Sequence, residues 1–286
     1  MKYNYYFQIA GLIVGIQAPA AIEFPSCMEP FQILEAKTAD LCYEIHWEGK
    51  YTDIEWVVDK TGYSVWKKDG HYVRKRSICS AGEKYFVFLE KTETKGQYKL
   101  YIPKELWEAE ILPSSLNFFQ FLAMEEGLLL HDAFILHSSF VAWHGKGILF
   151  TAPSGTGKST QADLWQTYEG ADVYNGDRTV IRRIKEKYYG FGSPYAGSSG
   201  IYRNESAPIC AIVILSQASE NRMVPLRGRK AFLPIFSETL MNTWNSDYME
   251  RVTDLLMDTV SSVPIYHLSC RPDQDAVNLV KQTLFQ

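Results

Sequence analysis

Apolar and polar positions alternate over most of the first hundred residues. Six short segments rich in Tyr, Val, Ile and Trp carry this pattern: residues 41–47, 54–59, 63–68, 72–78, 84–90 and 97–102. Such alternation is typical of strands with one buried face. Turn residues separate the segments, notably at Asp69–Gly70 and Lys95–Gly96. The pattern predicts an antiparallel β domain over residues 1–110, as a meander or a small sandwich, and it carries no motif that indicates chemistry.

An apolar run near the start, IAGLIVGIQAPAAI (9–22), needs a separate interpretation. A secretory signal would require a longer basic start, and here a single lysine precedes the run. Gln17 and Pro19 interrupt the run, so it is also too short to span a membrane. We therefore expect a buried strand and no transmembrane segment.

The hydrophobic period changes after residue 110. A helical stripe lies within residues 113–133, at Leu116, Phe119, Leu122, Ala123 and Leu130, with Pro113 and Ser114 as its start. Beyond it, expected strands at 133–143, 147–152, 171–175, 178–184, 188–193, 209–217 and 263–270 are mixed with expected helices at 158–168 and 273–285 and two more between 217 and 263. The unbroken apolar run 209–217 is typical of a strand buried on both faces. Residues 111–286 are therefore expected to form an α/β domain.

Charge and cysteine content narrow the functional classes. The net charge is −4 and the pI is near 5.9, which argues against nucleic acid or an anionic membrane as the main partner. The five cysteines are scattered and include no Cys-x-x-Cys pair. This is typical of reduced thiols rather than of a disulfide framework or a zinc site, so we expect a cytoplasmic protein.

The segment ILFTAPSGTGKST (148–160) carries the strongest chemical signal. Two glycines between a strand and a helix let backbone amides turn towards an anion, and the start of the helix adds its positive dipole. Lys158 supplies a charge for the β- and γ-phosphates and Ser159 a hydroxyl for magnesium. Ala152 stands where such loops usually begin with glycine, a change that this geometry tolerates. The expected nucleotide-binding residues here are Ser154, Gly155, Thr156, Gly157, Lys158, Ser159 and Thr160.

Each candidate also has a plainer interpretation. The glycine segment could be an ordinary turn with a chance lysine, although the preceding strand and the following helix favour a phosphate site. Asp177 follows Ser159 by eighteen residues and is the nearest candidate carboxylate for a metal or base role, yet it also lies in the turn-like sequence NGDR. His137 lies in an apolar strand, where a histidine is often a core residue.

Taken together, the stretches 136–160 and 174–177 resemble the HPr kinase/phosphorylase family, whose phosphate loop is related to that of ATP-dependent phosphoenolpyruvate carboxykinases. The family's loop form G-x-S-G-x-G-K-S matches Ser154, Gly155, Gly157, Lys158 and Ser159. Its Leu-His pair matches residues 136 and 137, and the second acid of its acidic pair matches Asp177. The resemblance covers about residues 130–216 and is strongest to stand-alone HPr-kinase-like proteins encoded beside peptide-modification genes.

The resemblance implies roles for these positions. Lys158 and the loop amides would hold ATP, Ser159 would hold magnesium, and Asp177, with His137 close to it, would take the acceptor's proton or bind the metal. Gly176 departs from the family, because an acid is expected there, which puts two-metal binding and the reverse phosphorylase reaction in doubt. A small-residue segment, 192–206, suits a mobile loop over the phosphates, with Arg203 supplying positive charge or lying in solvent.

These features together predict a magnesium-dependent, ATP-using kinase with an N-terminal antiparallel β domain and a kinase domain of the HPr kinase/carboxykinase type. The expected acceptor is a seryl or threonyl hydroxyl on a peptide or small protein, and a homo-oligomer is possible on the family's pattern. Two alternatives stay open: a small-molecule kinase, and a nucleotide-binding regulatory protein with little turnover. The basic cluster Arg227, Arg229 and Lys230 either contacts nucleotide or acceptor or is plain surface.

Overall fold

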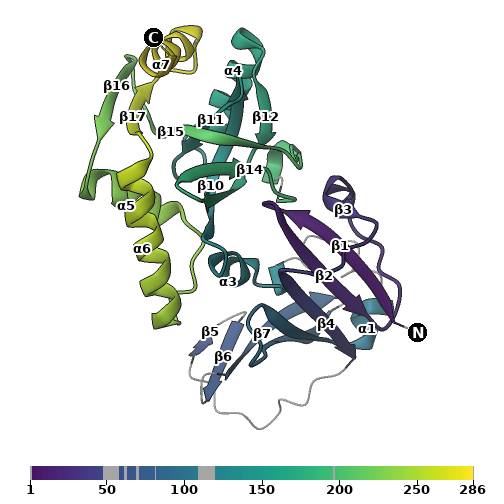
Figure 1. Ribbon diagram of the computed structural model, residues 1–286. Coiled ribbons are helices and arrows are strands. Elements are labelled where there is room, and N and C mark those ends of the chain that lie inside the picture. Colours follow the sequence, from purple (N-terminus) through teal and green to yellow (C-terminus); the bar gives the residue numbers. More distant parts are fainter. Residues whose placement is uncertain are drawn as a thin grey trace. The chain divides into compact units, whose positions relative to one another are not determined.

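The computed structural model describes residues 2–47, 58–60, 63–68, 71–80, 82–108, 120–195 and 197–285. The chain divides into two compact units, Met1–Gly127 and Leu128–Gln286, and each contains one large sheet (Figure 1). The architecture is therefore mixed α/β, with two sheets and several helices. The domain boundary predicted at residue 110 lies outside the described residues.

The sheet of the first unit has the strand order β3-β1-β2-β4-β9-β8-β7-β6-β5. Its strands are β1 (Tyr3–Ile9), β2 (Leu12–Ala18), β3 (Gln32–Ile33), β4 (Leu41–Trp47), β5 (Val58–Lys60), β6 (Tyr63–Lys68), β7 (His71–Ser80), β8 (Glu83–Lys91) and β9 (Gln97–Ile102). Two short helical segments belong to this unit, η1 (Ser26–Phe31) and α1 (Lys104–Glu108), and a third, α3 (Met124–Leu129), begins in it and ends in the second unit. The expected strands at 41–47, 63–68, 72–78, 84–90 and 97–102 are confirmed.

Two expectations for this unit are wrong. The apolar run 9–22 is not one strand, because Ala10 and Gly11 both take positive φ, 54° and 69°, and make the tight turn of the β1–β2 hairpin. The sheet is also not purely antiparallel, since β4 pairs in parallel with both β2 and β9. Parallel neighbours need a long crossover, and here β5 to β8 lie in sequence between β4 and β9. Alternation predicts β4 and β6 to β9 but not which strands lie beside β4.

The helix expected within residues 113–133 is also different where the structure describes it. Residues 113–119 lie outside the described part of the chain, and the following helical residues are interrupted at Ala123, whose φ is +49°. Helix α3 begins only at Met124. Two of its residues, Glu125 and Glu126, make buried ion pairs with Arg74 of β7 at 2.9 and 3.1 Å. Paired burial of these charges ties α3 to the sheet of the first unit.

The sheet of the second unit has the order β11-β10-β13-β14-β15-β17-β16, with β12 beside β10 and with β11 also beside β15. Its strands are β10 (Ala133–Trp143), β11 (Lys146–Thr151), β12 (Asp172–Asn175), β13 (Arg178–Ile184), β14 (Lys187–Phe191), β15 (Ser206–Gln217), β16 (Arg222–Leu226) and β17 (Ile265–Cys270). Its helices are α4 (Lys158–Glu169), η2 (Gly197–Ser199), α5 (Arg229–Glu238), α6 (Ser246–Ser262) and α7 (Gln274–Phe285). The strands and helices expected here are confirmed, and β16 is an edge strand that the sequence pattern did not predict.

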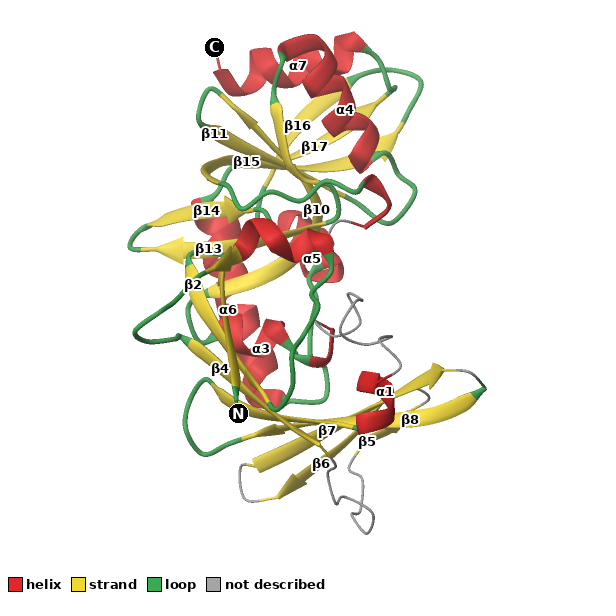
Figure 2. Cartoon of the chain, turned by 90° about the vertical axis from the view of Figure 1, so that its right-hand side faces the viewer, coloured by secondary structure: helices red, strands yellow, loops and turns green. Residues whose placement is uncertain are grey.

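Helices cover both faces of this sheet. Alternate residues of β11 enter different cores: Phe150 packs in the same cluster as Trp165 of α4, whereas Leu149 packs in the same cluster as Ile235 of α5. Helices α4 and α7 lie side by side over the first core (Figure 2), and α5 packs against α6 over the second. Long strands β10 and β15 each change partners along their length, so that β10, β11, β15, β14 and β13 close into a ring.

Phe140 of β10 is enclosed by two strand glycines. A Cβ at Gly190 would lie 2.9 Å from the Phe140 ring, and one at Gly147 would lie 2.8 Å from it. We expect Gly190→Ala to lower the free energy of unfolding by about 1–3 kcal/mol, because a fully buried ring has nowhere to move. Urea denaturation measures this. Adding Phe140→Leu to this variant should recover part of the lost stability. If the losses of the two single variants simply add in the double variant, the proposed clash is contradicted.

Among the described residues, no helix is both long enough and apolar enough to cross a membrane.

Candidate functional site

The glycine-rich loop joins β11 to α4, as expected. Gly155 and Gly157 have φ values of 78° and 118°. A Cβ at either position would meet nothing within 4 Å, so it is the backbone conformation rather than lack of space that requires glycine. Gly157 is the N-cap of α4 and has no side chain to occupy the free amides of the first turn. The start of this helix is therefore open to an anion.

Lys158, the first residue of α4, is buried with 7% of its surface exposed. Its Nζ donates hydrogen bonds to the carbonyls of Ala152 (2.7 Å) and Pro153 (3.3 Å), so the ammonium closes the loop from inside. Burial lowers the pKa of Lys158, and the negative charges of Glu238 and Asp177 partly oppose that shift. Both carboxylates thus lie near enough to act on the lysine charge.

The other residues predicted to bind nucleotide are accessible. Ser154, Ser159 and Thr160 are exposed and Thr156 is half-buried. Their side chains flank the loop and the first turn of α4, and Ser159 follows Lys158 directly. The hydroxyl expected to hold magnesium is therefore free of the core.

His137 lies at the point where β10 changes partners. Residues up to His137 pair with β13, and residues from Ser138 onward pair with β11. At this point Thr151, the last residue of β11, donates its hydroxyl hydrogen to the carbonyl of His137 at 2.9 Å. Ser139 donates to the carbonyl of Lys158 at 2.8 Å. These two bonds fix the end of β11 and the start of α4 beside His137.

Asp177 reaches the same point from a tight turn between β12 and β13. The side-chain oxygen of Asn175, a buried residue, accepts hydrogen bonds from the amides of Asp177 (2.9 Å) and Arg178 (2.7 Å). The carbonyl of Asp177 accepts from the amide of Ser138 at 2.9 Å. The turn interpretation of NGDR is thus correct as local structure, and the turn delivers the carboxylate to His137.

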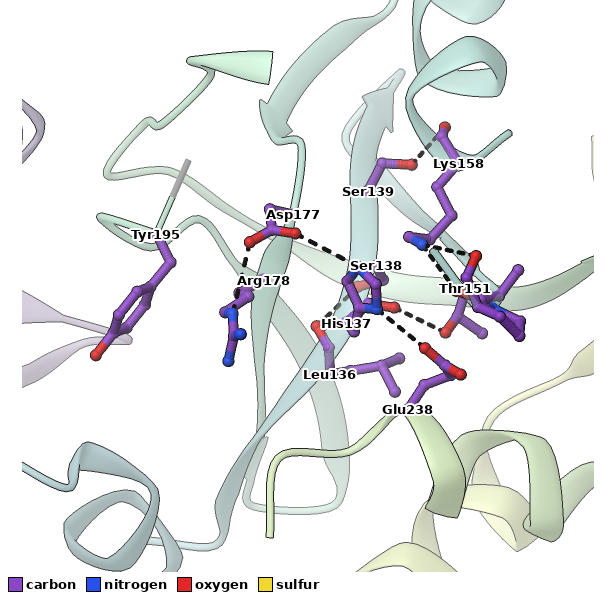
Figure 3. Close-up of polar contacts among 12 residues, drawn as sticks. Leu136, His137, Ser138, Ser139, Thr151, Lys158, Asp177, Arg178, Tyr195 and Glu238 are labelled. Carbon is purple, nitrogen blue, oxygen red and sulfur yellow. Dashed lines mark hydrogen bonds and ion pairs between the residues drawn. The ribbon is translucent and has the colours of Figure 1, made fainter. Parts of the chain in front are cut away.

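His137 lies between two carboxylates (Figure 3). Its Nε2 is 3.4 Å from Oδ1 of Asp177, and its Nδ1 is 3.0 Å from Oε2 of Glu238. A neutral imidazole donates from one nitrogen, so it can donate to one of these carboxylates at a time. The hydrogen bond from His137 lowers the pKa of Asp177 more than the neighbouring positive charges do, while burial opposes the shift. Asp177 is therefore ionised at neutral pH.

Glu238 was missed in the sequence. It is the last residue of α5, and its position depends on the next two residues joining β10: Thr239 bridges Leu136, and the amide of Leu240 donates to the carbonyl of Ile135 at 2.9 Å. Nothing in the spacing of residues 229–240 indicates this contact, since Glu238 is 101 residues from His137 in sequence. Fold topology alone brings the two together.

Segment η2 covers Asp177. Gly197 has a φ of +55°, and a Cβ added to it would lie 2.6 Å from Cβ and 2.7 Å from Cγ of Asp177. We expect Gly197→Ala to move η2 away from the carboxylate and to lower the turnover of any reaction at Asp177. Steady-state kinetics and the melting temperature measure the two effects. Gly200→Ala is the control, because Gly200 has a similar φ (+65°) but open space around it; equal losses in both variants would contradict a role for the contact.

The arginine expected over the phosphates lies elsewhere. Arg203 pairs with Asp172 at 2.8 Å, at the far end of β12. Asp172 pairs with Ala142 of β10, four residues beyond Ser138, which is about 13 Å along a strand. The positive charge nearest Asp177 is instead Arg178, whose Nε is 3.5 Å from Oδ2. Arg227 and Arg229 lie at the start of α5, at the opposite end of that helix from Glu238.

The donor set fits a phosphate and a cation of the magnesium type. Phosphate would find loop amides, the Lys158 ammonium and exposed hydroxyls, and a magnesium ion would find oxygens from Ser159 and Asp177 as well as from the phosphates. Within the described residues, no three or more His, Cys, Asp and Glu side chains are grouped to hold a metal by themselves. Magnesium commonly uses one or two carboxylates plus substrate phosphates, so the site does not need such a group.

Comparisons with known proteins match a family model and a number of solved structures. The family model of the SynChlorMet cassette protein ScmC matches residues 110–271. No curated protein matches the chain. A solved structure, the HPr(Ser) kinase/phosphatase from Coxiella burnetii, aligns at 10% identity over 53% of this chain and 99% of its own, with a TM-score of 0.33. A likeness at that score carries no argument about the fold or activity of this chain.

The ScmC match is of a different kind, because it spans more than half of the 286 residues. The matched segment includes the glycine-rich loop together with His137, Asp177 and Glu238. The chain belongs to the ScmC family.

Proposed function

We propose that this chain is a magnesium-dependent phosphotransferase that moves the γ-phosphoryl group of ATP to a hydroxyl on a peptide or small protein. The observation that carries the proposal is that the hydrogen bonds from Ser139 to Lys158 and from Thr151 to His137 hold the glycine-rich loop beside the His137–Asp177–Glu238 group (Figure 3). A phosphate-binding loop by itself would indicate a binding site and no catalysis. An ionised carboxylate beside that loop adds a group that can handle the proton of an acceptor.

The residues would act as follows. The loop amides and Lys158 hold the β- and γ-phosphates, and Lys158 neutralises part of the charge on them. The acceptor oxygen bonds to the γ-phosphorus while the bond from that phosphorus to the bridging oxygen breaks, and ADP leaves. The hydroxyl proton of the acceptor passes to Asp177. Magnesium, held by Ser159 and the phosphates with Asp177 as a further ligand, would supply additional positive charge.

The lowered pKa of Asp177 is consistent with this role. A carboxylate of low basicity takes a proton readily only once the hydroxyl oxygen has begun to bond to phosphorus. Phosphoryl transfer passes through a loose transition state in which positioning and charge stabilisation contribute more than base strength. His137, held by Glu238 on its other side, would fix the carboxylate in place rather than react itself.

The binding of nucleotide should depend on pH through Lys158. Because burial lowers its pKa, Lys158 loses its charge below the ordinary lysine value of about 10.4. We expect ATP affinity to be constant near neutral pH and to fall as the pH rises through that lowered pKa. Titration calorimetry between about pH 7 and 10 measures this. Affinity that stays unchanged until the pH exceeds the ordinary lysine range would contradict the assignment of Lys158.

The acceptor can be sought directly. The native chain, γ-labelled ATP and magnesium are added to an extract of source cells, and labelled products are separated by size. Label on a polypeptide, absent when Asp177→Asn replaces the native chain, is the expected result. Label in small molecules alone would indicate a metabolite kinase instead. Retained ATP binding with no labelled product would indicate a regulatory nucleotide-binding protein.

A further inference from the structure

A cavity separate from the glycine-rich loop lies in the C-terminal unit, where strands β16 and β17 meet helices α5 and α6. Its volume is about 880 Å³, which is within the range of small-molecule sites. It is lined by residues 225–229, by Phe232 of α5, by one face of α6 and by residues 261–266. None of the residues of the glycine-rich loop, and neither His137 nor Asp177, contributes to its wall.

Most of the wall is apolar. The larger apolar side chains in it are Leu226, Phe232, Met257, Val260, Ile265 and Tyr266. Met257 is 56% exposed, an unusual degree for a large apolar side chain on a helix that otherwise buries one face. Burial of such side chains by a ligand is favourable in proportion to the apolar surface removed from water. A ligand with an apolar body would therefore gain most of its binding free energy from contact with this apolar wall.

The polar part of the wall is positive. Arg227 and Arg229 flank Gly228 at the start of α5, and both line the cavity. Within the described part of the chain neither arginine forms an ion pair, and no acidic residue lines the cavity. Three hydroxyl residues, Thr253, Ser261 and Ser262, complete the lining. Uncompensated guanidinium groups beside an apolar surface complement a ligand that joins an apolar body to a carboxylate or similar anion.

We propose that this cavity is a second ligand site, for a small organic acid with an apolar body, held by its apolar wall and selected for charge by Arg227 and Arg229. It is distinct from the nucleotide site. The ten residues of α5, about 15 Å of helix, separate Arg229 at the cavity from Glu238 beside His137. The proposal does not depend on the phosphotransferase activity and can fail or succeed without it.

Decanoate is a suitable probe, with decylammonium as its oppositely charged counterpart. Calorimetric titration of the full chain should show decanoate binding more tightly than decylammonium by roughly tenfold, the size expected for two exposed charge pairs of up to about 0.7 kcal/mol each. Saturating ATP should leave the affinity for decanoate unchanged. Equal affinities for the two probes, or competition between decanoate and ATP, would overturn the proposal.

Four exposed positions give three matched variants. Arg227→Gln with Arg229→Gln should remove most of the preference for decanoate, whereas Lys230→Gln should not, because Lys230 is the neighbouring cation outside the cavity wall. Met257→Glu should reduce the preference for decanoate, because an acid in the wall offsets one of the two arginine charges. All three residues in the arginine and lysine variants are exposed, so folding should be preserved, and unchanged melting temperatures check this. The same loss in the Lys230 variant would overturn the assignment.

The same chemistry occurs at the end of a peptide. A short peptide that ends in two leucines is therefore tested in two forms, with a free C-terminal carboxylate and as its C-terminal amide. Its binding, compared with that of decanoate, distinguishes a peptide terminus from a small organic acid as the ligand. Decanoate binding at least as tightly as the free-carboxylate peptide supports a small-acid site. Binding of the free-carboxylate peptide without any binding of decanoate would overturn the small-acid assignment.

Discussion

Replacing Asp177 by asparagine is expected to lower the rate of phosphoryl transfer by roughly 100- to 10,000-fold, the usual contribution of a positioned general base. Asparagine keeps the size of the side chain but cannot accept a proton. Its contacts with the turn are preserved, because Asn175 binds the backbone of residues 177 and 178 rather than the carboxylate. ATP binding should therefore be retained. The rate of label transfer and the calorimetric Kd for ATP, measured on the same preparation, test both expectations.

A matched control is Asp172→Asn, which removes a carboxylate from the end of β12 opposite the turn that carries Asp177. Asp172 pairs with Arg203 on the surface and is not near His137 in the strand register. The Asp172→Asn variant should keep a rate of phosphoryl transfer within about twofold of the native rate, since exposed ion pairs contribute little to stability. A native rate in Asp177→Asn, or an equal loss in Asp172→Asn, would contradict the role given to Asp177.

The same variant separates the two roles proposed for Asp177. If it accepts the proton, the magnesium concentration that gives half-maximal ATP binding should not change in Asp177→Asn. If it mainly binds magnesium, that concentration should rise, because a neutral amide oxygen is a weaker ligand for a hard cation. Unchanged magnesium dependence with native turnover would contradict both roles.

Replacing Lys158 by methionine is expected to weaken ATP binding by roughly 10- to 150-fold, the loss of one hydrogen-bonding charge worth about 1.5–3 kcal/mol. Methionine fills a similar volume but leaves the carbonyls of Ala152 and Pro153 without their donor. Equilibrium binding of a fluorescent ATP analogue measures the change. Turnover should fall by at least as much, because the lost charge also stabilises the transition state.

Lys146→Met is the control for this variant. Lys146 lies at the opposite end of β11 from the loop and stacks over the ring of Phe285 at the surface. It should leave ATP affinity unchanged. Native ATP affinity in Lys158→Met would mean that the glycine-rich loop is not the phosphate site.

Local sequence features predicted the parts of the site that are local in the fold. The glycine-rich loop could be located because a strand, two glycines, a lysine and a helix are contiguous in sequence, and positive φ at Gly155 and Gly157 leaves little choice of residue. The turn at NGDR could be foreseen for the same reason. Periodicity also predicted most strands of the second unit, since each of them has at least one buried face.

Contacts between distant segments could not be predicted in this way. Glu238 meets His137 only because residues 239 and 240 join β10, and no periodicity records that pairing. Arg203 was expected over the phosphates, yet the bridge between Asn175 and Tyr202 places it beside Asp172. The parallel pairing of β4 in the first sheet could not be predicted for the same reason, because a strand's own residues do not specify its partner.

The distance from the γ-phosphorus of a bound, non-hydrolysable ATP analogue to the Asp177 carboxylate tests whether one site both binds ATP and transfers its phosphoryl group. A crystal structure with the analogue and magnesium would provide it. An acceptor oxygen must lie about 3–3.5 Å from phosphorus and within about 3 Å of the base. We therefore expect a separation of roughly 5–6 Å, with Lys158 on the phosphates. Phosphates bound away from Gly155–Lys158, or a separation beyond about 10 Å, would contradict a single site for binding and transfer.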